Sequence, residues 1–100
     1  MSDFVVQLAP AAEGDIADAI LWYRARNALM ADAFRAEVFD VIERIGRTPL
    51  QKPEDAEGNR RSLLQRFPYS VVYDVLGNTV TILAVTHHRR RPNYWRTARS

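Results

Sequence analysis

The sequence predicts an α+β fold with the element order βααβββ, in which a helical hairpin packs on a small, mainly antiparallel sheet. Three short runs rich in β-branched and aromatic residues between positions 61 and 88 predict a β-meander. Apolar residues spaced three and four apart between positions 10 and 46 predict two helices. With 47% hydrophobic residues, the chain can bury one modest core, and we expect a single domain over residues 1–100.

The N-terminal part predicts a strand followed by a helix. The strand covers residues 4–8 and ends at Ala9-Pro10. Pro10 suits the first helical position, because the N–H that proline lacks would have no partner there. The helix should bury one apolar face, made of Ala12, Ile16, Ile20 and Tyr23.

A second helix is predicted after a break at residues 26–28. It should end near Gly46 and Pro49, and the connection to the first helix is short enough for an antiparallel hairpin. Residues 49–60 are polar and contain Pro53 and Gly58, so they predict a surface loop. The buried face of the second helix should consist of Ala33, Phe34, Val38, Val41, Ile42 and Ile45.

The meander consists of strands around Leu63-Leu64, at residues 71–75 and at residues 80–85. Pro68 separates the first two, since proline cannot donate within a central ladder. Gly77-Asn78 supplies a two-residue turn that accepts a positive φ between the second and third.

Side-chain alternation then predicts the faces of the last strand. Regular pleating places Thr79, Thr81, Leu83, Val85 and His87 on one face, and Val80, Ile82, Ala84, Thr86 and His88 on the other. Both faces are apolar near the middle, so we expect helices over one and partial shielding of the other. Tyr69 and Tyr73 should share a face, with core roles and hydrogen-bonded hydroxyls.

The formal charge of +2 hides an asymmetry between the two parts of the chain. Residues 1–59 carry six basic and eleven acidic side chains, a net charge of −5. Residues 60–100 carry eight arginines and one acidic residue, Asp74, a net charge of +7. The planar guanidinium suits carboxylate and phosphate groups, so an acidic partner is expected.

Composition also excludes several classes of function. The chain has no cysteine, which excludes disulfides and thiolate metal sites, and we expect no metal and no cofactor. No apolar run approaches the roughly 18 residues of a membrane span, and the N-terminus lacks the pattern of a signal peptide. A cytoplasmic location without membrane association is therefore expected.

The sharpest candidate site is the basic, aromatic run from His87 to Arg96. Cations interleaved with aromatic rings suit a single-stranded nucleic acid or an acidic protein groove. A solvated charge run is the alternative, although such a run has no need of Trp95. Either His87 or His88 can act as a general acid or base, or can simply form a hydrogen bond at a strand end.

Several segments resemble a known family. They are Ala9–Ile16 (APAAEGDI), Arg66–Tyr73 (RFPYSVVY) and Val85–Arg90 (VTHHRR). With the βααβββ order, they resemble the RelE/ParE superfamily of bacterial type II toxin–antitoxin toxins over nearly the whole chain. The resemblance implies that fold, and one of two activities.

RelE-like members are ribosome-dependent, metal-independent endoribonucleases that cut mRNA, whereas ParE-like members poison DNA gyrase. In this chain Ser70 stands where RelE-type ribonucleases place a catalytic arginine, and Leu63 stands where they place a lysine. Arg61 matches a basic position and Tyr94 the C-terminal tyrosine. The resemblance is thus closer to ParE-like members. As a ribonuclease, the chain would rely on Arg61, His88 and Tyr94 for phosphate stabilisation and proton transfer.

The resemblance implies a toxin that forms a hetero-oligomer with a small acidic antitoxin. The target would be DNA gyrase, or the ribosome and mRNA in the ribonuclease alternative, and a non-toxic paralogue that only binds its antitoxin is a third possibility. Target or antitoxin binding is expected at Arg66, His87, Arg89, Arg90, Arg91, Tyr94 and Trp95.

Overall fold

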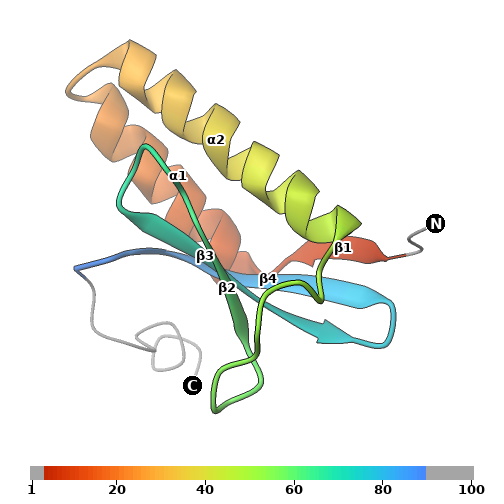
Figure 1. The fold of residues 1–100 in the computed structure, drawn as a ribbon. Coiled ribbons are helices and arrows are strands. Elements are labelled where there is room, and N and C mark those ends of the chain that lie inside the picture. The colour runs from red at the N-terminus through yellow and green to blue at the C-terminus, as the bar shows by residue number, and fades with distance from the viewer. Residues whose placement is uncertain (1–3, 90–100) are drawn as a thin grey trace.

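The computed structural model describes residues 4–89, and its elements follow the predicted order βααβββ. Two helices lie side by side across one face of a four-stranded sheet (Figure 1). Within residues 4–89, neither helix has the length and apolar character needed to cross a membrane. The elements are β1 (Val5–Leu8), α1 (Pro10–Arg24), α2 (Ala28–Arg47), β2 (Arg60–Leu63), β3 (Tyr69–Leu76) and β4 (Thr79–His87).

The sheet has the strand order β1-β4-β3-β2, so the predicted meander forms three adjacent strands. The β2–β3 and β3–β4 pairs are antiparallel, whereas β1 pairs with β4 in parallel. A parallel pair needs a long crossover, which the intervening helices and strands provide. The mainly antiparallel α+β architecture is confirmed, and β1 and β2 form the two edges of the sheet.

The helices begin and end where local chemistry dictates. Pro10 opens α1, as the sequence predicts. The Asn27 side chain caps α2 by accepting hydrogen bonds from the N–H groups of Leu29 (2.9 Å) and Met30 (3.4 Å). Near the other end of α2, Gly46 lets the helix approach β1, because a Cβ there would lie 2.8 Å from Val6 Cγ2.

The core lies between the helical layer and the sheet. Phe34 is fully buried and packs edge-to-face on Phe67, with 5.4 Å between ring centroids. Tyr69 packs on Phe34 at 4.9 Å, and the Tyr73 hydroxyl donates a hydrogen bond of 2.9 Å to the Pro49 carbonyl. Tyr69 and Tyr73 therefore share the helix-facing side of the sheet, as predicted.

A β-bulge in β4 corrects the predicted faces of this strand. Val72 pairs with Ala84, but the next residue of β3, Tyr73, pairs with Ile82, so Leu83 is the extra residue. Regular alternation separates Val85 from Ile82, yet both lie in the core beneath the helices. The extra residue shifts the alternation by one position, so the prediction was right before the bulge and wrong after it.

The loop before β2 is held by its own side chains. The Asp55 side chain accepts hydrogen bonds from the N–H groups of Glu57 (2.9 Å) and Asn59 (3.0 Å). Arg60 then reaches back across the loop, donating to the Lys52 carbonyl and pairing with Glu54 at 3.1 Å. These contacts fix residues 52–60 relative to the sheet.

Candidate functional site

The sheet face turned away from the helices brings together Arg61, Leu63, Ser70 and His88, and is called the second sheet face below. Arg61 and Leu63 alternate along β2, and Leu63 pairs with Ser70 of β3. Ser70 pairs with Thr86, two residues before His88. The bulge and the strand register thus place the two described ribonuclease candidates, Arg61 and His88, on one face.

Ser70 and His88 form a hydrogen-bonded pair on this face. Their Oγ and Nε2 atoms lie 3.1 Å apart, and the serine is only 1% exposed. The imidazole lies at the exposed end of β4. His88 is therefore a hydrogen-bonding residue at a strand end, and its ring is accessible.

Arg61 lies far from this pair. Arg61 pairs with Val72 of β3. The His88 N–H donates a hydrogen bond to the carbonyl of Pro68, which lies four residues before Val72 in the sequence. Four residues along the strand and two strand spacings across give about 16 Å between the Cα atoms of Arg61 and His88. The two residues share a face without forming one compact cluster.

His87 points to the helix-facing side, opposite to His88. Its ring packs edge-to-face on Tyr69, with centroids 5.0 Å apart. Its Nδ1 accepts a hydrogen bond of 3.0 Å from the Arg89 N–H, which places the proton of the neutral ring on Nε2. The two adjacent histidines thus serve different surfaces, as the strand geometry predicts.

Between α1 and the ends of β3 and β4 lies a cavity of about 440 Å³, called the aromatic pocket below. Three aromatic rings and the His87 imidazole line it, with a carboxylate and a guanidinium also contributing. Such a lining combines an apolar surface with both signs of charge. The lining residues are Asp18, Ala19, Trp22, Tyr23, Tyr69, His87 and Arg89.

Arg66 lies in the loop between β2 and β3, where Glu37 of α2 holds it. The Glu37 carboxylate, 8% exposed, accepts hydrogen bonds from the N–H groups of Gln65 (2.6 Å) and Arg66 (3.3 Å). Arg66 Nε lies 3.6 Å from the same carboxylate, while its side chain is 66% exposed. The loop is thus fixed to α2 and the Arg66 guanidinium can contact a partner.

The remaining predicted binding residues, Arg90, Arg91, Tyr94 and Trp95, lie outside the described residues. Their roles stay predictions. Among residues 4–89, no group of three or more histidine, aspartate or glutamate side chains is arranged to hold a metal ion.

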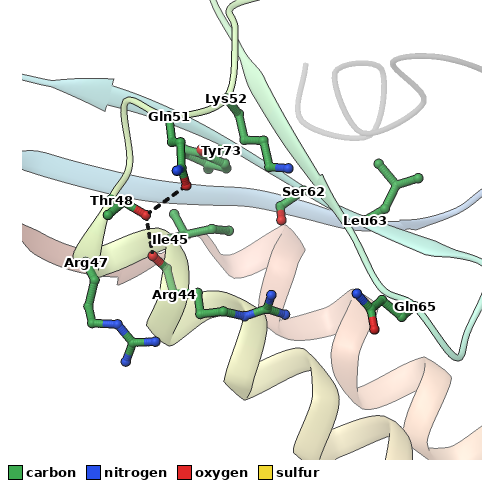
Figure 2. Close-up of a pocket in the computed structure, with 10 residues that line it drawn as sticks. All are labelled: Arg44, Ile45, Arg47, Thr48, Gln51, Lys52, Ser62, Leu63, Gln65 and Tyr73. Atoms are coloured by element: carbon green, nitrogen blue, oxygen red, sulfur yellow. Dashed lines mark hydrogen bonds between the residues drawn. The ribbon is translucent and has the colours of Figure 1, made fainter.

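Two surfaces were missed by reasoning from the sequence. Leu21, Trp22 and Leu29 are exposed around the tip of the helical hairpin, Leu29 at 77%. The sequence did indicate this exposed apolar surface, since Leu21 and Trp22 fall outside the apolar stripe of α1. The second is a polar cleft at the C-terminal end of α2 (Figure 2), which brings Arg44 of α2 together with Ser62 and Gln65 from a later part of the sequence.

Comparison with known proteins adds evidence on the family. The family described as "ParE toxin of type II toxin-antitoxin system, parDE" matches residues 6–92. No curated protein matches the chain. The fold is similar to that of a chain in the solved structure described as "Chromosomal ParDE TA system from P. aeruginosa". The TM-score is 0.76 and the sequence identity is 18%. The match covers 84% of this chain and 95% of that chain.

Proposed function

The chain belongs to the ParE toxin family of type II toxin–antitoxin systems, and from this premise we propose that it arrests growth by acting on DNA gyrase and is neutralised by an acidic antitoxin. This activity needs binding surfaces but no catalytic centre within the chain.

The observation that favours gyrase over mRNA cleavage is the environment of Ser70. This residue stands where the resemblance to RelE-type ribonucleases implies a catalytic arginine. Here it is a small, buried side chain hydrogen-bonded to His88. Other preorganised donors each stabilise a transition state by roughly 3–4 kcal/mol. By analogy, a cation that stabilises the transition state of phosphate cleavage contributes a similar amount. Among the residues that the structure describes, no such cation lies on the second sheet face between Arg61 and His88.

The proposed antitoxin surface joins the aromatic pocket to the exposed hairpin tip. Trp22 belongs to both, and Leu21 and Leu29 extend the apolar area beyond the pocket. Arg26 stacks on the Trp22 ring at 3.6 Å and Arg89 lies at the pocket edge, which adds positive charge. An amphipathic acidic segment that folds on binding matches this combination.

Induction of the chain alone tests the proposal. Soluble expression should arrest growth and induce the SOS response, and purified protein should inhibit supercoiling by gyrase. Primer extension should show intact transcripts in the same cells. Growth that continues at verified soluble expression would contradict toxicity and favour a paralogue that only binds an antitoxin.

The ribonuclease alternative is favoured by one observation, the shared face of Arg61 and His88. It requires that Tyr94 or another group complete the site. Codon-phased cuts in transcripts, lost in Arg61→Gln or His88→Gln, would support it against gyrase poisoning. An unchanged cleavage pattern in both variants would exclude these residues from catalysis.

A further inference from the structure

The cleft at the C-terminal end of α2 is separate from the surfaces proposed above. It has a volume of about 360 Å³ and lies between α2, the loop before β2, and β2 itself (Figure 2). Tyr73 forms part of its lining, held by the hydrogen bond to Pro49. The α2–β2 cleft is defined here by its polar lining residues Arg44, Arg47, Gln51, Lys52, Ser62 and Gln65.

Two cations in this cleft lack an anionic partner. Within residues 4–89 no ion pair joins Arg44 or Lys52 to a carboxylate, and no hydrogen bond engages the Ser62 hydroxyl. Arg47, in contrast, pairs with Glu43 at 2.7 Å. Arg44 and Lys52 therefore carry the unbalanced charge of the cleft.

Figure 2 shows how these groups are arranged. The Arg44 side chain comes from α2 and the Lys52 side chain from the loop, and both extend toward the space beside Ser62. The Gln65 amide lies on the far side of that space. Donors from three separate segments thus surround one volume.

One of the terminal carbonyls of α2 beside the cleft is already hydrogen-bonded. Helix C-terminal carbonyls normally repel negative charge. Here the Arg44 carbonyl already accepts hydrogen bonds from the Thr48 N–H (3.1 Å) and the Thr48 hydroxyl (3.3 Å). These bonds reduce the negative potential at the point where the cleft begins.

We propose that the α2–β2 cleft binds the phosphate group of a small phosphorylated ligand. A guanidinium, an ammonium, a hydroxyl and an amide arriving from different directions match a tetrahedral oxyanion better than a planar carboxylate. The volume exceeds that of a phosphate ion and lies within the roughly 300–1,000 Å³ of small-molecule sites. This inference is independent of toxicity and of the target.

Titration of the purified full chain tests the site. Inorganic phosphate, adenosine 5′-monophosphate and adenosine are added in turn, and amide shifts of Ser62 and Gln65 and the Arg44 side-chain signal are followed by NMR. Phosphate and the monophosphate should shift these signals saturably, and adenosine should not. Tighter binding of the monophosphate assigns the rest of the cleft to the nucleoside, whereas equal affinity assigns recognition to the phosphate alone.

A charge-matched pair of variants provides the control. Arg44→Gln/Lys52→Gln should weaken binding at least tenfold, while Arg24→Gln/Arg35→Gln, which removes the same charge from other exposed positions, should change it less than twofold. Lys52→Gln alone serves if the first variant folds poorly. The inference is overturned if the cleft signals do not move at millimolar phosphate, or if both double variants lose affinity equally.

Discussion

Asp15 of α1 accepts a hydrogen bond from the Val85 N–H, with 3.0 Å between Oδ2 and the backbone nitrogen. β1 pairs with β4 only as far as Ile82, and within residues 4–89 no other strand pairs with the outer edge of β4 beyond that residue. The Asp15 carboxylate supplies the missing acceptor and joins the first helix to the strand that leads to the histidines. A side chain thus completes the ladder where β1 ends.

Replacing Asp15 tests this contact. Asp15→Ala leaves the Val85 N–H without its acceptor and should lower the free energy of unfolding by about 1–3 kcal/mol. Asp15→Asn keeps an oxygen acceptor and should cost less. Urea denaturation followed by circular dichroism measures both, and equal losses would mean that the carboxylate charge, not the hydrogen bond, is what stabilises the edge.

Glu37 is predicted to control the loop that carries Arg66. Glu37→Ala removes the acceptor of two backbone N–H groups and should cost about 1–3 kcal/mol of stability. Hydrogen exchange at Gln65 and Arg66 should accelerate. Glu37→Gln retains one oxygen and should give an intermediate effect, whereas unchanged exchange in the alanine variant would contradict the proposed anchoring.

Tyr73 should make the fold sensitive to alkaline pH. Burial raises the pKa of Tyr73 above its ordinary value of 10.0, partly offset by nearby Arg60. Because the pKa of Tyr73 is higher in the folded state than in the unfolded state, the protonated hydroxyl contributes to the stability of the fold. This contribution is complete below about pH 10 and is lost as pH rises through the folded-state pKa. Tyr73→Phe should cost about 1 kcal/mol at pH 7, since the hydrogen bond to Pro49 is lost.

The difference in stability between wild type and Tyr73→Phe should therefore shrink above pH 10. Thermal melts between pH 7 and pH 11 measure it. Some alkaline sensitivity should persist in the variant, because burial also raises the pKa of Tyr23. A difference that is constant across this range would show that the Tyr73 hydroxyl does not titrate with the fold.

The arginine run is predicted to serve binding, not folding. Replacing Arg89, Arg90 and Arg91 together with alanine should cost at most about 1 kcal/mol of stability for each residue. The same variant should bind its target and its antitoxin more weakly. Its antitoxin affinity should also depend less on salt concentration. Phe34→Ala is the comparison: it empties a fully buried position and should cost roughly 3–5 kcal/mol. If the triple arginine variant melts at the same temperature as Phe34→Ala, the three arginines are structural. If the triple variant stays folded and fully toxic, the three arginines are only a solvated charged surface.

The sequence predicted the fold because each element carries a local signal. Pro10 and the Asn27 region mark helix ends, and Gly77, with φ of 60°, marks the hairpin turn. The bulge carries no such signal, since Leu83 is an ordinary strand residue. Its position depends on how β3 and β4 pack beneath the helices.

The candidate site was predicted less completely, for a related reason. His87 and His88 were expected on opposite faces, and they are, because adjacent strand residues alternate. The α2–β2 cleft joins Arg44 to Ser62 through the tertiary fold, and neither residue belongs to a motif. Distances of this kind follow from packing and not from spacing along the chain.

The bulge at Leu83 also has a consequence for comparing this chain with others of similar fold. Strict alternation counted from the start of β4 gives the correct face only for residues before Leu83. An alignment that matches the start of the strand can therefore still assign His87 and His88 to the wrong faces of the sheet. Deleting Leu83 would restore regular pleating and leave His88 on the same side of the sheet as Ser70, because Ala84 and the residues after it would keep their partners on β3. The side on which a residue of this strand lies is therefore set by its partner on β3, and a relative that lacks the extra residue would carry the same side chains on the same faces with its numbering shifted by one.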